Sequence, residues 1–229
     1  VENACSSGST AMFEARRAVS HGDCDVALVI GVDSLTQFGG GTIPLVDDDW
    51  EISQGMTMPA LYAMRARRYM HEFGATVEQL AKVSVKARSH GARNPDAQFQ
   101  KSVTVEEVLG SRPIADPLTL LQCCPTGDGA AAAIICASDV AGRFEAEPVK
   151  ILASELCSGK FTNGFRDMTS MEIAVRGAGI AYEQAGLGPD DIDVAEVHDA
   201  FSIAELLYYE AFGFCERGEA VHLLESGET

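Results

Sequence analysis

The sequence predicts an α/β protein, because helical and strand-like patterns alternate along its 229 residues. Two apolar runs, 26–32 and 129–138, consist mostly of β-branched or small residues and are typical of strands buried on both faces. A helical repeat precedes the first run, and helical patterns follow the second. A helix that leads into such a strand is typical of a parallel sheet, so we expect a parallel arrangement.

The remaining elements follow from local signals. Residues 1–22 are expected to form a loop and then a helix, with Ser6, Ser7 and Ser9 offering N-cap oxygens. Thr104 followed by Glu107 predicts a capping box at the start of a short helix. Apolar periodicity predicts the other helices at about 57–73, 76–90, 170–186 and 202–212. Apolar runs predict two further strands, at 149–156 and 192–197.

Composition excludes several classes of protein. The formal net charge of −17 repels phosphate backbones, so we expect no nucleic-acid partner. No apolar run approaches the roughly 18 residues of a membrane span. The seven cysteines are odd in number and include no CxxC pair, which favours neither a zinc site nor a disulfide framework. Free thiols predict a reducing compartment, the cytoplasm.

Cys5 is the first candidate for chemistry. It lies in Asn3–Ser9, directly before the first predicted helix. The unpaired N–H groups and the positive dipole end of a helix favour a thiolate, which is the nucleophilic form of cysteine. The alternative is an ordinary small residue in a turn.

His198 is the second candidate, because it ends the predicted strand 192–197. Binding sites in parallel sheets lie at the carboxyl ends of strands. A histidine there can donate a hydrogen bond to a developing oxyanion or act as an acid or base. A structural histidine at a strand end is the alternative.

Two other motifs are more simply interpreted as structural than as catalytic or ligand-binding. The run 122–129, which contains Cys123 and Cys124, is interpreted as a structural turn before a strand rather than as a redox or catalytic centre. Arg65, Arg67 and Arg68 lie on one predicted helix. They are candidates for binding a phosphate-bearing ligand, although a solvated helix face that pairs with its own acids is the simpler interpretation.

Together these pieces resemble the thiolase superfamily, and in particular the sterol-carrier-protein-type thiolases with their bacterial and archaeal relatives. The resemblance rests on four blocks that occur in the family's order: NACSSGSTAMFEAR, NPDAQFQ, TLLQCCPTGDGAAAAII and EVHDAFSIAELLYYEAFGFCERGEA. It covers nearly the whole chain.

The resemblance implies a thiolase fold: two similar βαβ halves in a layered αβαβα arrangement, with a mostly helical loop domain inserted in the first half. Residues 1–37 and 116–147 would belong to the first half, 38–115 to the loop domain and 148–229 to the second half. Family members continue on both sides, so we expect a chain incomplete at both ends. The missing part would include a Gly-His-Pro motif whose histidine activates the nucleophile.

The resemblance also assigns roles. Cys5 matches the acyl-accepting nucleophile, and His198 matches the histidine of the family's HDxF block, which helps to form an oxyanion hole. Sterol-carrier-type members commonly have an acid/base cysteine where this chain has Ala200. Proton transfer must then fall to another group.

The function implied is that of an acyl-CoA acyltransferase that makes or cleaves 3-oxoacyl-CoA through a Cys5-linked acyl-enzyme. It would need no metal and no permanently bound cofactor, with coenzyme A and acyl-CoA as substrates. Arg65 and Arg68 are the candidates for binding CoA. The protein is expected to be a homodimer or tetramer, and the resemblance allows a small partner protein. An aldolase of the same fold and a non-catalytic acyl-CoA-binding or partner-binding subunit are the alternatives.

Overall fold

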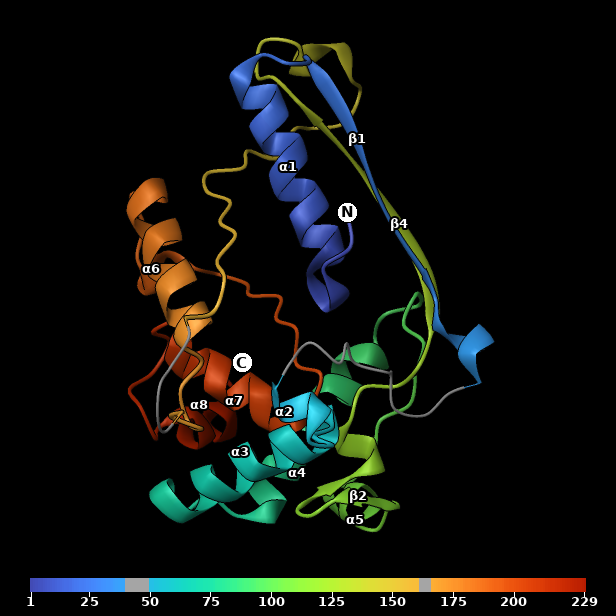
Figure 1. Cartoon of the computed structure of the whole chain (residues 1–229), viewed down its shortest axis with the longest axis vertical. Helices are drawn as coiled ribbons and strands as arrows, with labels where there is room; N and C mark the ends of the chain where they lie inside the picture. The colour runs from blue at the N-terminus through green and yellow to red at the C-terminus, as the bar shows by residue number, and fades with distance from the viewer. Residues whose placement is uncertain (40–49, 161–165) are drawn as a thin grey trace. The chain divides into compact units, whose positions relative to one another are not determined.

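The computed structural model of the chain describes residues 1–39, 50–160 and 166–229 (Figure 1). These residues form two compact units. The first unit comprises Val1–Gly40, Thr126–Ser158 and Arg176–Gly188, and the second comprises Gly41–Pro125, Gly159–Val175 and Pro189–Thr229. Residues 40–49 of the predicted loop domain lie outside the described residues.

The first unit is built on one helix and one pair of strands. Helix α1 (Ser7–His21) follows a 3₁₀ turn and ends at Gly22, whose φ of +76° provides a left-handed C-cap. Strand β1 (Val26–Ser34) pairs with β4 (Asp128–Cys136) in antiparallel register, from Val26 opposite Cys136 to Ser34 opposite Asp128. The two strands were correctly predicted, but the expected parallel arrangement is wrong. The two segments are far apart in sequence, so sequence alone did not fix their relative direction.

Burial on both faces of these strands is also wrong for the described residues. Helix α1 packs against β1 and lies beside the strand pair (Figure 1). On β1 the buried residue is Val29, whereas the alternate residues Leu28, Ile30 and Val32 are exposed. Successive side chains of a strand point to opposite faces, so one face of this sheet is covered and the other is bare and apolar.

The second unit is mainly helical and contains the hydrophobic core of the described chain. The largest fully buried side chains include Tyr69, Leu80, Ile203 and Leu206. Helix α7 is apolar around most of its circumference and lies at the centre of this core, where it contacts α3, α4 and α8. The helices are α2 (Trp50–Ser53), α3 (Met58–Phe73), α4 (Val77–Gly91), α5 (Val105–Leu109), α7 (Ser202–Ala211) and α8 (Ala220–Ser226).

The short elements complete the chain. Strands β2 (Pro113–Ala115) and β3 (Leu118–Thr119) form a small antiparallel pair. Helix α6 spans Glu172–Ala185. The 3₁₀ turns are Ala4–Ser6, Leu35–Phe38, Leu120–Gln122, Ala141–Arg143 and Pro189–Asp191. Within the described ranges, no helix is both long enough and apolar enough to cross a membrane.

The predicted helices are confirmed, with ends within about two residues. The predicted capping box of α5 is confirmed too: the Thr104 hydroxyl accepts from the N–H of Glu107, and the Glu107 carboxylate accepts from the N–H of Thr104. Helix α4 starts with a second box, made by Thr76 and Gln79. Sequence analysis missed α2 and α8, which are both short.

The predicted strands at 149–156 and 192–197 are wrong. Both segments are irregular in the structure. A strand exists only when a neighbour satisfies its backbone hydrogen bonds, and in the described part of the chain neither segment joins a ladder. Apolar composition alone therefore predicted two strands that do not form in the described part of the chain.

Candidate active site

Cys5 is exposed in the 3₁₀ turn Ala4–Ser6, directly before the 15-residue helix α1. The turn is held by local hydrogen bonds. The backbone N–H of Asn3 donates to the Ser7 hydroxyl at 2.8 Å, and that hydroxyl donates to the Ala4 carbonyl at 2.8 Å. The Asn3 amide donates to the Thr10 hydroxyl at 3.0 Å. The predicted position of Cys5 at a helix N-terminus is therefore confirmed.

The turn carries backbone strain next to the thiol. Ala4 has a φ of +45°, the only positive φ of a residue other than glycine in the described chain. A left-handed conformation costs an alanine roughly 1–2 kcal/mol. Such outliers cluster at functional sites, where surrounding contacts enforce them. Here the strained residue immediately precedes the candidate nucleophile.

The predicted serine caps are wrong. Ser6 occupies the N-cap position of α1, but its side chain makes no capping hydrogen bond. The Ser9 hydroxyl donates back to the Ser6 carbonyl at 3.0 Å, and Ser7 is used within the turn. The helix start beside Cys5 is therefore not capped by its N-cap side chain, although the N–H of Ser7 donates to the Ala4 carbonyl. Uncapped N–H groups at a helix start favour a negative charge nearby.

His198 lies in the second unit, on an irregular segment that enters α7. Its side chain is exposed, whereas Phe201, three residues later, is buried. The Phe201 ring stacks on Tyr62 with ring centroids 4.6 Å apart. The carbonyl of Ala200 accepts from the N–H of Cys124 at 2.8 Å. The backbone on the C-terminal side of His198 is therefore anchored.

A buried ionic cluster lies beside this segment. The ammonium of Lys86 on α4 is 2.5 Å from Oε1 of Glu205 and 2.7 Å from the hydroxyl of Tyr209, both on α7. The Tyr209 hydroxyl donates to the same Glu205 oxygen. Glu205 is only 4% exposed. Burial, a hydrogen bond with Glu205 and the negative charge of Glu205 raise the pKa of Asp199 to about 7.

Sequence analysis missed this cluster. The available signal was the position of Glu205 and Tyr209 four residues apart on a helix that is otherwise apolar. Residues at that spacing share a helix face. A glutamate on a buried face must be paired, which would have prompted a search for its cation.

The candidate CoA-binding arginines lie on α3 in the second unit, and both already have protein partners. Arg65 donates to the carbonyls of Met168 and Ser170 at 3.0 and 3.1 Å, and burial lowers the pKa of its guanidinium. Arg68 pairs with Glu72 one turn later at 2.9 Å. Arg67, the third member of the cluster, pairs with Asp116. The predicted binding of CoA by Arg65 and Arg68 stays a prediction.

The loop before β4 has a structural role. Asp128 accepts from the N–H and the hydroxyl of Thr36 at 2.8 and 2.5 Å, which ties the start of β4 to the turn after β1. These hydrogen bonds lower the pKa of Asp128. Burial raises the pKa of Cys123 to about 11, so this thiol is protonated at neutral pH. Both observations favour the structural interpretation of the loop.

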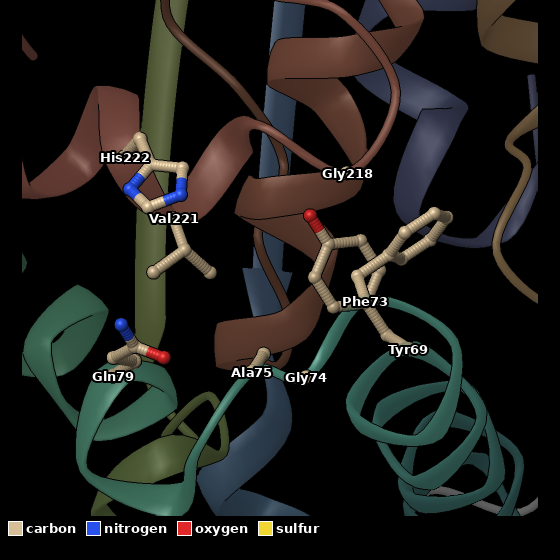
Figure 2. A pocket seen from close by; sticks show the side chains of 8 residues that line it. All are labelled: Tyr69, Phe73, Gly74, Ala75, Gln79, Gly218, Val221 and His222. Carbon is tan, nitrogen blue, oxygen red and sulfur yellow. The ribbon is translucent and has the colours of Figure 1, made fainter.

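Figure 2 shows a pocket of about 90 Å³ in the second unit, with Tyr69 and Phe73 on one side and Val221 and His222 on the other. Ligand sites for drug-sized molecules are usually about 300–1,000 Å³. None of the predicted site residues lines this pocket. It therefore has no place in the candidate chemistry. In the described residues, no group of three or more His, Cys, Asp or Glu is arranged to hold a metal ion.

Comparison with protein families decides the assignment. The model of the thiolase N-terminal domain matches residues 1–139, more than half of the chain, and that of the thiolase C-terminal domain-like family matches residues 155–229. The chain belongs to the thiolase family. Cys5 lies in the part matched by the N-terminal domain, and His198 lies in the part matched by the C-terminal domain.

Thiolases and acetyltransferases are among its relatives. The chain is 43% identical to the benzoylsuccinyl-CoA thiolase subunit BbsB of Thauera aromatica and 44% identical to an acetyl-CoA acetyltransferase of Methanothermobacter thermautotrophicus. All of this thiolase chain is covered in both cases, but only 60% and 61% of the relatives. Human sterol carrier protein 2 is 34% identical, with 45% of its length covered. The chain thus spans about three fifths of the thiolase relatives.

Solved structures agree on the thiolase fold. The Ltp2-ChsH2(DUF35) aldolase matches with a TM-score of 0.85 at 33% identity, over 96% of this chain and 60% of that chain. The dimeric peroxisomal thiolase of Saccharomyces cerevisiae matches with a TM-score of 0.60 at 18% identity, over 98% of this chain and 67% of that one. The predicted fold class is confirmed at the level of the family.

Proposed function

We propose that the full-length protein is an acyl-CoA acyltransferase of thiolase type, in which Cys5 carries the acyl group. The observation that supports this most directly is the exposed Cys5 thiol in a strained turn at the start of α1. Two of the relatives described above are a thiolase subunit and an acetyl-CoA acetyltransferase.

The chemistry is a two-step transfer. In the direction of synthesis, the Cys5 thiolate attacks the thioester carbonyl of an acyl-CoA, the CoA thiolate leaves, and the acyl group then passes to the C2 carbanion of acetyl-CoA, which forms a carbon–carbon bond. In the direction of cleavage, the Cys5 thiolate attacks the C3 ketone of a 3-oxoacyl-CoA, the C2–C3 bond breaks, and the acetyl-CoA carbanion leaves and takes up a proton. The acyl group then passes from Cys5 to a CoA thiolate. Both directions regenerate the Cys5 thiolate. A covalent intermediate replaces one difficult step with two easier ones.

His198 is proposed to donate a hydrogen bond to an oxyanion in this cycle. Its exposed ring on an anchored backbone suits a donor whose position must be fixed before the charge develops. Ala200 carries no group that can transfer a proton, so the acid/base of the reaction lies elsewhere.

The direct test is intact-mass spectrometry of the full-length protein after exposure to acetyl-CoA. Wild type should gain one acetyl group, and Cys5→Ala should lose both the adduct and turnover. Cys24→Ala is the control, since it removes a half-buried thiol from the same unit. His198→Ala should lower kcat roughly 10²–10³-fold, the usual cost of one oxyanion donor. An acetyl adduct that persists in Cys5→Ala at an unchanged rate would contradict the assignment.

An aldolase is the second candidate, because the Ltp2-ChsH2(DUF35) aldolase is a close structural match. An aldolase would release acyl-CoA from a branched side chain without an acyl-enzyme. The mass measurement separates the two functions, because only the acyltransferase forms an adduct on Cys5. A third candidate, a non-catalytic subunit, would show neither an adduct nor turnover.

We propose that the arginines of α3 bind CoA, and we choose Arg68 rather than Arg65 for the test. Arg65 secures the carbonyls of Met168 and Ser170, so its replacement would disturb the fold. Arg68→Glu should raise KM for CoA while kcat stays unchanged, the signature of lost uniform binding. Arg17→Glu is the matched control, an exposed arginine of α1 that also pairs with an acid on its own helix. An unchanged KM would assign Arg68 to the solvated helix face.

We further propose a homodimer or tetramer in the cytoplasm, with acyl-CoA as substrate and no permanently bound cofactor. One relative is named as a subunit and one matching structure as a two-component aldolase, which supports a small partner protein. The seven cysteines are not paired with one another in disulfide bonds in the described structure, which supports a reducing compartment. Mass measurement of the native assembly tests the oligomer and the partner together.

A further inference from the structure

Two buried polar side chains join the start of α7 to the segment that precedes β4. The side-chain amide of Gln122 donates to the Ser202 hydroxyl at 3.2 Å. The side-chain oxygen of Gln122 accepts from the backbone N–H of Thr119 at 3.1 Å. Gln122 is 2% exposed and Ser202 is 4% exposed. Because an N–H group only donates, the contact with Thr119 fixes which end of the Gln122 amide faces Ser202.

This contact extends a short antiparallel pairing between the two segments. Cys123 forms an isolated β-bridge with Phe201, and the N–H of Cys124 donates to the carbonyl of Ala200 at 2.8 Å. Three consecutive residues of one segment therefore meet three consecutive residues of the other. His198 lies only two residues beyond the last of these pairs, so the pairing holds the backbone from which its side chain extends.

The hydrogen bond gives this junction a direction that apolar packing would not give. The neighbouring residues Leu118, Phe201 and Ile203 are buried and apolar. Apolar contacts are non-directional, whereas a hydrogen bond requires a defined distance and angle. In a shifted arrangement the Gln122 amide would stay buried without its partner, which is unfavourable. The contact between Gln122 and Ser202 therefore selects one position for the start of α7.

We propose that Gln122 is a positioning residue, which holds the backbone of His198 in place for the reaction through its hydrogen bond to Ser202. This role rests on the proposed function of His198 as an oxyanion donor. Such a donor is most effective when its position is fixed before the charge develops. The side chain of His198 is exposed, so its position depends on the backbone that carries it. Gln122 itself does not act on the substrate.

Two variants of the full-length protein remove the contact from its two sides. Gln122→Met keeps the length of the side chain but neither hydrogen bond. It should lower kcat roughly 10- to 100-fold, the scale of a small misplacement of a catalytic group, while KM changes little. Ser202→Ala should lower kcat by a similar factor. Because Ser202→Ala deletes a single hydroxyl, it carries the same test if Gln122→Met does not fold.

Two further variants separate positioning from a general structural role. In Gln122→Glu, one side-chain oxygen accepts from Thr119 and the other accepts from the Ser202 hydroxyl, which can donate as well as accept. This variant should recover most of the kcat that Gln122→Met loses. The double variant Gln122→Met/His198→Ala should be no slower than His198→Ala alone, because Gln122 acts through His198.

Gln79→Met is the matched control. Gln79 accepts from the backbone N–H of Thr76 at 3.0 Å, as Gln122 does from Thr119, but its amide donates to Glu225 on α8. Its kcat should match that of wild type. A loss of kcat as large as that of Gln122→Met would show that any lost glutamine cap slows the enzyme, and would overturn the proposal.

Acetylation of Cys5 and a slow His198→Ala variant test the proposed function independently. If both hold while Gln122→Met and Ser202→Ala keep the wild-type kcat, the positioning role is wrong. A double variant that is slower than His198→Ala would also contradict it, because Gln122 would then act without His198. If His198→Ala is as fast as wild type, the proposed function of His198 fails and the role of Gln122 fails with it.

Discussion

The two units differ in how completely they bury their apolar side chains. In the second unit, helices α3, α4, α7 and α8 enclose one core, and Leu206 on α7 is completely buried. In the first unit, α1 covers one face of the β1–β4 pair and leaves the other bare, with Leu28 64% exposed. Helices satisfy their own backbone hydrogen bonds and need only side-chain packing. A sheet needs neighbouring strands, and it needs a covering layer on each face that carries apolar side chains.

The comparison teaches that the apolarity of a segment does not by itself predict its burial. Run 26–32 contains only apolar residues and glycine, whereas run 202–212 contains two glutamates, yet only the second is enclosed by described residues. Four sets of substitutions sharpen this contrast, from the largest expected effect to the smallest.

Leu206→Ala should have the largest effect. Leu206 is fully buried in the core cluster, so truncation leaves a cavity and loses packing. The free energy of unfolding should fall by about 2–5 kcal/mol. Urea denaturation followed by circular dichroism measures this loss. A loss under about 1 kcal/mol would mean that the core around α7 collapses to fill the gap.

Gly218→Ala tests the tight packing beside the pocket of Figure 2. Gly218 has a φ of +89°, and an added Cβ would lie 2.6 Å from Cδ1 of Phe73. Strain and overlap together should cost about 1–3 kcal/mol. Gly142→Ala in the first unit is the control, since its added Cβ would meet open space. Equal melting temperatures for the two variants would refute the assigned strain.

Thr104→Ala and Ser6→Ala compare the helix starts of the two units. Thr104 caps α5 with its side chain, whereas Ser6 at the N-cap of α1 does not. Loss of a capping side chain costs typically about 1 kcal/mol. We expect that loss for Thr104→Ala and a change within about 0.5 kcal/mol for Ser6→Ala. Thr104→Ser keeps the hydroxyl and should restore the stability; thermal unfolding reports all three.

Leu28→Ala should have the smallest effect on the 229-residue chain. Its side chain projects from the bare face of β1, so truncation should change the free energy of unfolding by less than about 0.5 kcal/mol. Leu28→Lys should instead raise solubility, because it breaks up an exposed apolar stripe on a strand that is paired along one edge only in the described sheet. A loss comparable to that of Leu206→Ala would show that the face is covered in solution.

The sequence by itself determined the local structure and the family of this protein. Periodicity and capping residues predicted α3, α4 and α5 closely, because helix starts are set by neighbours within four residues. The joint motifs, which include those around Cys5 and His198, indicate the thiolase family, and the family models confirm it. The position of Cys5 in a turn directly before α1 was likewise predicted from the sequence.

Only the tertiary structure decided how distant segments pair. The antiparallel direction of β1 and β4, the absence of ladders at 149–156 and 192–197 among the described residues, and the bare face of the sheet all depend on partners far away in sequence. The protein partners of Arg65 and the contact of Lys86 with Glu205 across two helices depend on them as well. The hydrogen-bond partners of a strand and the partners of a buried charge come from segments that the fold brings together. Local sequence does not indicate which segments these are.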